Sequence, residues 1–87
     1  MVITKKTVAD QIIKYINRKI SLSDLVDWAE NAIQEADFDK RDAGLLRDIV
    51  GRLGLANVKE FGLTWDDCYE HLHKLGYDIN VTVSKTG

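Results

Sequence analysis

Apolar side chains recur every three or four residues through most of this 87-residue chain. In the clearest case, which follows Ser21, they form one stripe made of Leu22, Leu25, Val26, Ala29, Ala32, Ile33 and Ala36. At about 100° per residue, such a stripe covers one face of an α-helix and leaves the other face polar. The sequence contains no proline that would interrupt a helix from within. The pattern therefore predicts a mainly α-helical fold.

Capping residues divide the chain into four predicted helices. The first covers about residues 5–17. Ser21 opens the second, and Asp24 three residues later predicts a capping box that satisfies free backbone N–H groups. Thr64 opens the last helix, and Gly76 ends it. The predicted inner face of the last helix consists of Trp65, Cys68, Tyr69, Leu72 and Leu75.

The third helix is predicted between Asp39 and Gly54. Asp39 is the expected N-cap, with Asp42 in the position of a second capping box, and Gly54 is expected to close the helix with a Schellman-type turn. Gly44 and Gly51 fall inside this helix. Because glycine in a helix interior costs about 1 kcal/mol relative to alanine, either this cost is simply tolerated or another element approaches closely there.

After Gly76 the apolar period changes from 3.6 to 2, which predicts a half-buried β-strand over Tyr77–Val83. A lone strand leaves its backbone groups unpaired. We expect it to pair either with Met1–Ile3 or with the same strand of a second copy, which would make a homodimer. The predicted fold is a compact bundle of about four helices with a short C-terminal β-strand, forming a single domain over residues 1–87.

Composition narrows the class of protein. With 45% hydrophobic and 30% charged residues, the chain is expected to fold and to be soluble. No apolar run approaches the roughly 20 residues that span a membrane, and the N-terminus lacks the features of a secretory signal. Cys68 is the single cysteine, so no intrachain disulfide can form, which suits a reducing cytoplasm.

Residues with catalytic or metal-binding potential are few. His71 and His73 are two positions apart, so on a helix they point in nearly opposite directions. Asp67, Cys68 and His71 share one flank, but no further Cys or His completes a zinc site there. The acidic residues around Cys68 would raise its pKa and oppose a nucleophilic role. We therefore expect no metal, no cofactor and no enzymatic activity.

The charge distribution bears on nucleic acid as a partner. Five of the six charged residues within positions 1–19 are basic, and eight of the eleven within positions 20–48 are acidic. The last predicted helix carries Asp66, Asp67 and Glu70, which would repel phosphate and oppose entry into a DNA groove. The charge distribution therefore disfavours nucleic acid as the binding partner. A regulator that binds nucleic acid through Lys5, Lys6 and Lys14 remains an alternative.

A protein partner is favoured by the second helix. Trp28 lies at the edge of its apolar stripe, and a half-exposed tryptophan is a typical interface anchor. The predicted partner surface comprises Trp28, Asp24, Asp27, Asn31 and Glu35. The sequence thus favours a non-enzymatic protein-binding module, such as a small regulator or an inhibitor of the immunity or antitoxin type. A self-associating structural protein is the third alternative.

Overall fold

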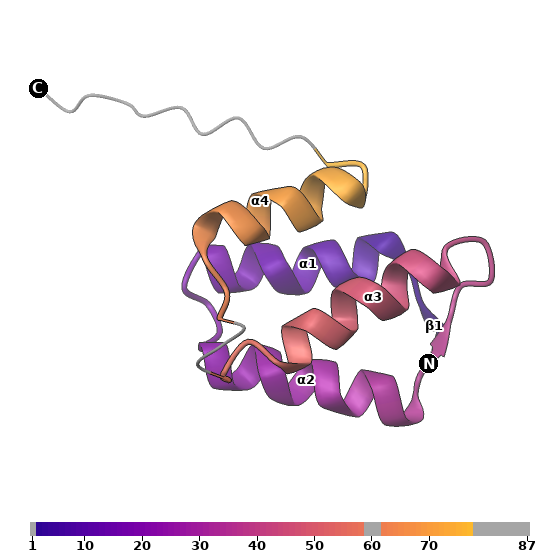
Figure 1. Ribbon diagram of the computed structural model, residues 1–87, viewed down its shortest axis with the longest axis horizontal. Helices are drawn as coiled ribbons and strands as arrows, with labels where there is room; N and C mark the ends of the chain where they lie inside the picture. The colour runs from indigo at the N-terminus through magenta and orange to yellow at the C-terminus, as the bar shows by residue number, and fades with distance from the viewer. Residues whose placement is uncertain (1, 59–61, 78–87) are drawn as a thin grey trace, which may run out of the picture.

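The fold was analysed in a computed structural model that describes residues 2–58 and 62–77. Four helices account for most of these residues, so the predicted mainly helical fold is confirmed (Figure 1). None of the helices within the described ranges is long and apolar enough to cross a membrane. In chain order the elements are β1 (Val2–Ile3), α1 (Lys5–Ile16), α2 (Leu22–Glu35), β2 (Asp37–Phe38), α3 (Ala43–Gly54) and α4 (Trp65–Lys74).

The helix α1 lies at the centre of the packing. It contacts α2, α3 and α4, while α3 packs most extensively on α2. Figure 1 shows α4 beside α1 on one side of the molecule and α2 on the other. The apolar stripes meet in one core, whose fully buried large side chains are Ile3, Val8, Ile12, Leu25, Leu46, Ile49, Val50, Leu53 and Leu72. Burial of these side chains is the main force that holds the four helices together.

Three helices begin with a capping box. The Asp24 N–H donates to Ser21 Oγ at 3.0 Å and the Ser21 N–H donates to the Asp24 carboxylate at 3.1 Å, which confirms the predicted box. Thr64 and Asp67 make the same pair of bonds at the start of α4. A third box, between Thr4 and Thr7 at the start of α1, was not predicted, because Glu or Gln rather than Thr usually stands at that position.

The predicted start of the third helix is wrong by several residues. The Asp39 carboxylate accepts a hydrogen bond from the Arg41 backbone N–H at 3.1 Å, and such a local bond stabilises a turn in competition with the helix. The helix instead begins at Ala43, and its N-cap Asp42 makes no side-chain capping bond. The predicted Schellman turn is also wrong, because Gly54 is helical and the C-cap Leu55 has φ −101°.

At Gly44 and Gly51 of α3 the structure favours a tolerated cost over close approach of another element. A Cβ added at Gly44 would meet nothing within 4 Å, so no element approaches there. At Gly51 the nearest atom is Ile33 Cδ1 at 3.8 Å, an ordinary van der Waals contact. A Cβ at Gly54 would lie 3.7 Å from Glu30 Cγ and 3.9 Å from Ala29 Cβ. The helices α2 and α3 therefore touch at Gly51 and Gly54, at ordinary packing distance.

The pairing of the N-terminal strand also differs from the prediction. Residues 2–3 pair in parallel with β2, with Ile3 opposite Phe38, so the partner of the N-terminal strand is the connection between α2 and α3. Of the predicted strand Tyr77–Val83, only Tyr77 lies within the described residues. It belongs to the turn that ends α4, where Gly76 has φ 90° and the Tyr77 N–H donates to the Leu72 carbonyl at 2.9 Å. The proposed strand-mediated homodimer concerns residues outside the described ranges.

Candidate functional site

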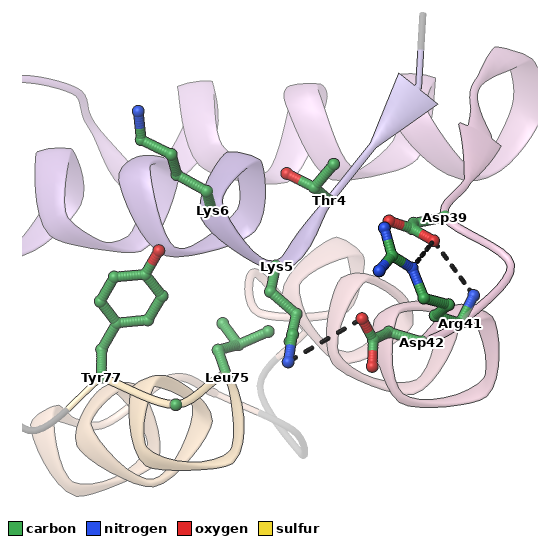
Figure 2. Close-up of a pocket in the computed structure, with 9 residues that line it drawn as sticks. Thr4, Lys5, Lys6, Asp39, Arg41, Asp42, Leu75 and Tyr77 are labelled. Carbon is green, nitrogen blue, oxygen red and sulfur yellow. Dashed lines mark hydrogen bonds and ion pairs between the residues drawn. The ribbon is translucent and has the colours of Figure 1, made fainter.

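A hollow of about 610 Å³ lies where the N-terminal end of α1 meets the turn before α3 and the end of α4 (Figure 2). It is lined by Thr4, Lys5, Lys6, Asp39, Arg41, Asp42, Leu75, Gly76 and Tyr77. Figure 2 shows Leu75 and Tyr77 on the α4 side of this hollow and the acidic residues on the opposite side. Its lining thus brings together the two ends of the described chain and the turn between β2 and α3.

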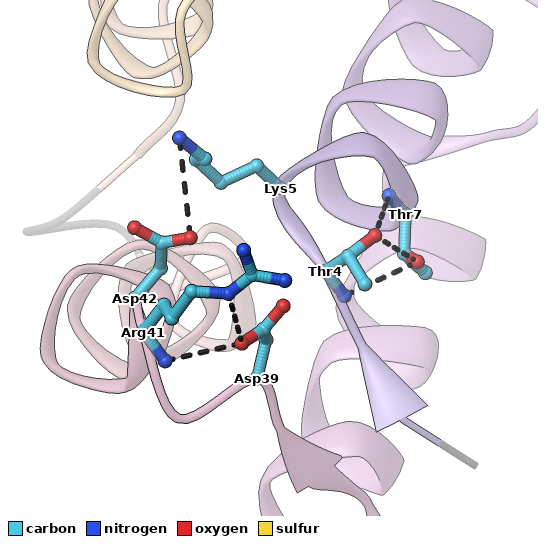
Figure 3. A network of polar contacts seen from close by, with 6 residues as sticks. All are labelled: Thr4, Lys5, Thr7, Asp39, Arg41 and Asp42. Atoms are coloured by element: carbon cyan, nitrogen blue, oxygen red, sulfur yellow. Dashed lines mark hydrogen bonds and ion pairs between the residues drawn. The ribbon is translucent and has the colours of Figure 1, made fainter.

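The charges in this hollow are largely paired with one another (Figure 3). Lys5 Nζ lies 3.9 Å from Asp42 Oδ2, and Arg41 Nε lies 3.7 Å from Asp39 Oδ1. The Asp42 carboxylate therefore faces a lysine of α1 and does not cap its own helix. A charged ligand entering this hollow would have to compete with these pairs. The Lys5–Asp42 pair connects α1 with the start of α3, whereas the Arg41–Asp39 pair lies within the turn that precedes α3.

The opposite end of the bundle carries an exposed aromatic pair. The rings of Tyr15, in the last turn of α1, and Trp65, the first residue of α4, are stacked with centroids 5.8 Å apart and an interplanar angle of 25°. Trp65 is 50% exposed, so its predicted place in the core is wrong. The apolar spacing of α4 does include Trp65, but its position at the very start of the helix places it beyond the edge of the core.

A second hollow, of about 430 Å³, adjoins this aromatic pair. Its lining residues are Tyr15, Arg18, Lys19, Ile20, Ser21 and Trp65, with no carboxylate among them. Neither Arg18 nor Lys19 forms an ion pair within residues 2–58 and 62–77. In the sequence these two cations belong to the basic N-terminal segment, and no local signal links them to Trp65, which is distant in the chain.

Arg18 has an unusual backbone conformation. Its φ of 59° lies in the left-handed region, and no other non-glycine residue in the described ranges has a positive φ. The conformation closes α1 with a Schellman motif, in which the Lys19 N–H donates to the Lys14 carbonyl at 2.8 Å and the Arg18 N–H to the Tyr15 carbonyl at 3.0 Å. Glycine usually occupies this position because a Cβ is strained there.

The predicted partner surface lies along α2. Asp27, Asn31 and Glu35 are exposed, while Trp28 is half-buried and packs against the core at the edge of the apolar stripe, as expected. A shallow groove of about 220 Å³ is lined by Trp28, Asn31, Ala32, Glu35 and Ala36. The groove thus joins three of the five predicted residues. Asp27 is not among its lining residues, and Asp24 is engaged in the capping box at the start of the helix.

Asp67, Cys68 and His71 share a flank of α4 but do not converge on a common point. Cys68 is fully buried, and burial together with the negative charge of Asp67 raises the pKa of its thiol to about 11. The Asp67 carboxylate accepts the Thr64 N–H bond, which holds its pKa below the usual value. Among the described residues no three His, Cys, Asp or Glu side chains are placed to hold a metal ion.

His71 is the one buried polar side chain of the described core. It is 7% exposed, and its Nδ1 atom has no hydrogen-bond partner within the described ranges. Desolvation lowers the pKa of the imidazole, and the positive charges of Lys74 and Arg52 lower it further, against the opposing effect of Asp67. The side chain is therefore held in its neutral form in the folded protein near neutral pH.

We expect acidification to destabilise the fold through His71. Because the unfolded chain takes up the proton first, the free energy of unfolding should be constant above the unfolded pKa of 6.5 and should fall below it, towards the lower folded pKa. One proton limits the slope to about 1.4 kcal/mol per pH unit. Urea unfolding at several pH values between 7.5 and 5.5 measures this slope. His71→Gln should flatten this dependence, and an unchanged slope in that variant would assign it to other groups.

Within residues 2–58 and 62–77 the fold consists of four helices and a parallel sheet of two short strands. Three surfaces differ in chemistry, namely the hollow with paired charges, the groove on α2 and the hollow beside Tyr15 and Trp65. No protein-family model matches the chain, and neither a curated protein nor a solved structure matches it. A function must therefore be argued from the surfaces themselves.

Proposed function

We propose that this chain is a non-enzymatic protein-binding module, a small regulator or inhibitor that uses the acidic face of α2 to bind a basic surface on its partner. The observation that carries the proposal is the charge of α2. Its 14 residues include four carboxylates, on Asp24, Asp27, Glu30 and Glu35, and no basic side chain. All four residues are exposed. Within the described ranges none of these carboxylates is in an ion pair.

This charge arrangement is unfavourable in the free protein. Asp24, Asp27 and Glu30 follow one another at intervals of three, and like charges at this spacing destabilise a helix by a few tenths of a kcal/mol per pair. Glu35 stands in the last turn, which contains no basic residue and where the helix dipole is negative. A basic partner would relieve both effects. A surface whose carboxylates lack ion pairs within the described residues is well suited to binding a basic surface.

The groove beside Trp28 adds an apolar anchor to this face. The half-buried indole forms one wall, and Ala32 and Ala36 leave room because their side chains are small. Tryptophans in such settings often contribute about 2 kcal/mol or more to binding. We therefore expect a partner segment that places one apolar side chain against Trp28 and basic side chains near Asp27 and Glu35.

The test uses Asp27→Lys, since the exposed Asp27 side chain makes no hydrogen bond or ion pair within the described residues. Proteins retained by the immobilised chain are identified, and the dissociation constant of each purified candidate is measured by titration calorimetry. Asp27→Lys should weaken binding at least tenfold, or about 1.4 kcal/mol, with the fold unchanged. Asp24 is unsuited to this test because its replacement would also remove the capping box.

The matched control is Asp48→Lys, which makes the same change in net charge at an exposed position of α3. It should leave the dissociation constant within about twofold. Equal effects of the two variants would show that only net charge matters, and no effect of Asp27→Lys would exclude the α2 face. Trp28→Ala should also weaken binding, provided that circular dichroism shows an intact fold.

A further inference from the structure

The hollow beside Tyr15 and Trp65 differs in chemistry from the other two surfaces. The hollow of Figure 2 holds paired charges of both signs, and the groove on α2 is acidic. By contrast, Arg18 and Lys19 line the Tyr15–Trp65 hollow with no carboxylate beside them. It therefore combines an exposed aromatic ring with two cations that have no ion-pair partner in the described part of the chain.

We propose that this hollow binds single-stranded nucleic acid, with a base stacked on Trp65 and the adjoining phosphates held by Arg18 and Lys19. One face of the indole already stacks on Tyr15, and half of its surface is open to solvent. A nucleobase placed there continues the existing stack. Aromatic platforms flanked by cations bind single strands in this way with little sequence preference.

A single strand fits these observations better than a duplex or an acidic peptide. In a duplex the bases are stacked on one another and offer no free face to the indole. An acidic peptide would satisfy the two cations, but its carboxylates would leave the aromatic platform uncovered. A single strand presents a planar ring and an anionic group in every repeat unit, which matches both features of the hollow.

The backbone of Arg18 supports a binding role. The left-handed conformation would be less strained with glycine, yet the chain has an arginine whose side chain lines the hollow. Strained residues often persist where a side chain is needed for function. The Schellman hydrogen bonds fix the backbone of Arg18 close to that of Tyr15, so its side chain extends from a fixed point beside the aromatic pair.

The Tyr15–Trp65 hollow and the hollow of Figure 2 lie at different ends of the molecule. Figure 1 places the end of α1 and the start of α4 at one end of the molecule, and the start of α1 and the start of α3 at the other. Lys5 is the first residue of α1, and its partner Asp42 is the N-cap of α3. The basic residues that the sequence suggested for nucleic acid, Lys5, Lys6 and Lys14, are thus not gathered in this hollow. With only two phosphate contacts, the slope of log K against log salt should be about −1.4.

The test measures binding of the full chain to a fluorescein-labelled strand of ten thymidines by anisotropy at low salt. Trp65→Ala should weaken binding by roughly 5- to 150-fold, the range expected for one stacked base. Arg18→Gly should reduce the salt slope by about 0.7 while leaving the fold as stable or more stable, so that unfolding cannot explain the loss. Lys40→Ala, an exposed lysine in the turn at the opposite end, is the control and should leave binding unchanged.

Two further measurements can overturn the proposal. In a Trp28→Phe variant, Trp65 is the single tryptophan, and stacking of unlabelled strand should quench its emission. Absence of quenching, or no change of anisotropy at low salt, would refute stacking on this residue. A peptide of ten glutamates serves as the competitor. If it binds as tightly as the oligonucleotide, and if the same variants abolish its binding, the site recognises acidic protein instead. Neither outcome affects the α2 face, which is tested separately by Asp27→Lys.

Discussion

Replacement of Ile49 by alanine is expected to lower the free energy of unfolding by about 2–5 kcal/mol. Ile49 is fully buried on α3, the helix that packs most extensively on α2. The substitution removes apolar contacts and leaves a cavity that the surrounding helices can fill only in part. A domain of this size is typically stable by only about 4–13 kcal/mol, so the loss is a large fraction of the total. Urea unfolding followed by circular dichroism measures the change.

The control for this prediction is Ile33→Ala. Ile33 also belongs to an apolar helical stripe, but it is 47% exposed at the outer edge of the contact between α2 and α3. Its replacement should cost less than about 1 kcal/mol. Both variants should keep the same dependence on urea concentration, since the surface exposed on unfolding hardly changes. Similar losses in the two variants would contradict the packing of these helices.

The comparison of Ile33 with Ile49 also shows how far periodicity alone can predict this fold. Spacing and capping residues predicted where α1, α2 and α4 begin, because these signals are local and act within one turn of helix. Spacing also placed Ile33 on the inward face of its helix. Which part of each stripe is covered depends on how the helices cross, and one helix contains no information about its neighbours. The exposure of Ile33 could therefore not be predicted.

The errors at Asp39 and Asp42 have a related cause. Either aspartate can cap a helix, and the choice between them depended on competing interactions. Asp39 bonds the Arg41 N–H within a local turn, and Asp42 faces Lys5 across the bundle. The second interaction joins residues that are far apart in the sequence. The same holds for β1, whose partner strand β2 is only two residues long and carries no alternating pattern.

The candidate sites were predictable to different degrees. The acidic face of α2 belongs to a single helix, so the sequence correctly placed Trp28 at the edge of the apolar stripe and Asp24, Asp27 and Glu35 on the exposed surface. The pair of Tyr15 and Trp65 joins two helices that are distant in the chain, and only the tertiary structure brings them together. One signal was available, since Trp65 directly follows the capping Thr64 and so stands at a helix end.

Cys68 provides the second prediction with a large expected effect. Its thiol in the folded protein should react with iodoacetamide at pH 8 at least 100-fold more slowly than in the urea-unfolded chain. The pKa raised from 9.0 to about 11 by burial, and secondarily by Asp67, reduces the thiolate fraction about 100-fold, and thiolate is the reactive form. Full burial of the side chain also blocks the reagent.

Labelling of the native protein should therefore occur through transient unfolding, so its rate reports the stability of the core. Mass spectrometry follows the alkylated fraction with time. Ile49→Ala should accelerate labelling by the factor by which it raises the unfolding equilibrium constant, about tenfold for each 1.4 kcal/mol lost, whereas Ile33→Ala should change the rate only slightly. Equally fast labelling of folded and unfolded protein would instead show an accessible thiol of ordinary pKa, and labelling faster than in the unfolded chain would show a thiolate activated by the fold. The second result would make Cys68 a candidate nucleophile and would contradict a role in binding alone.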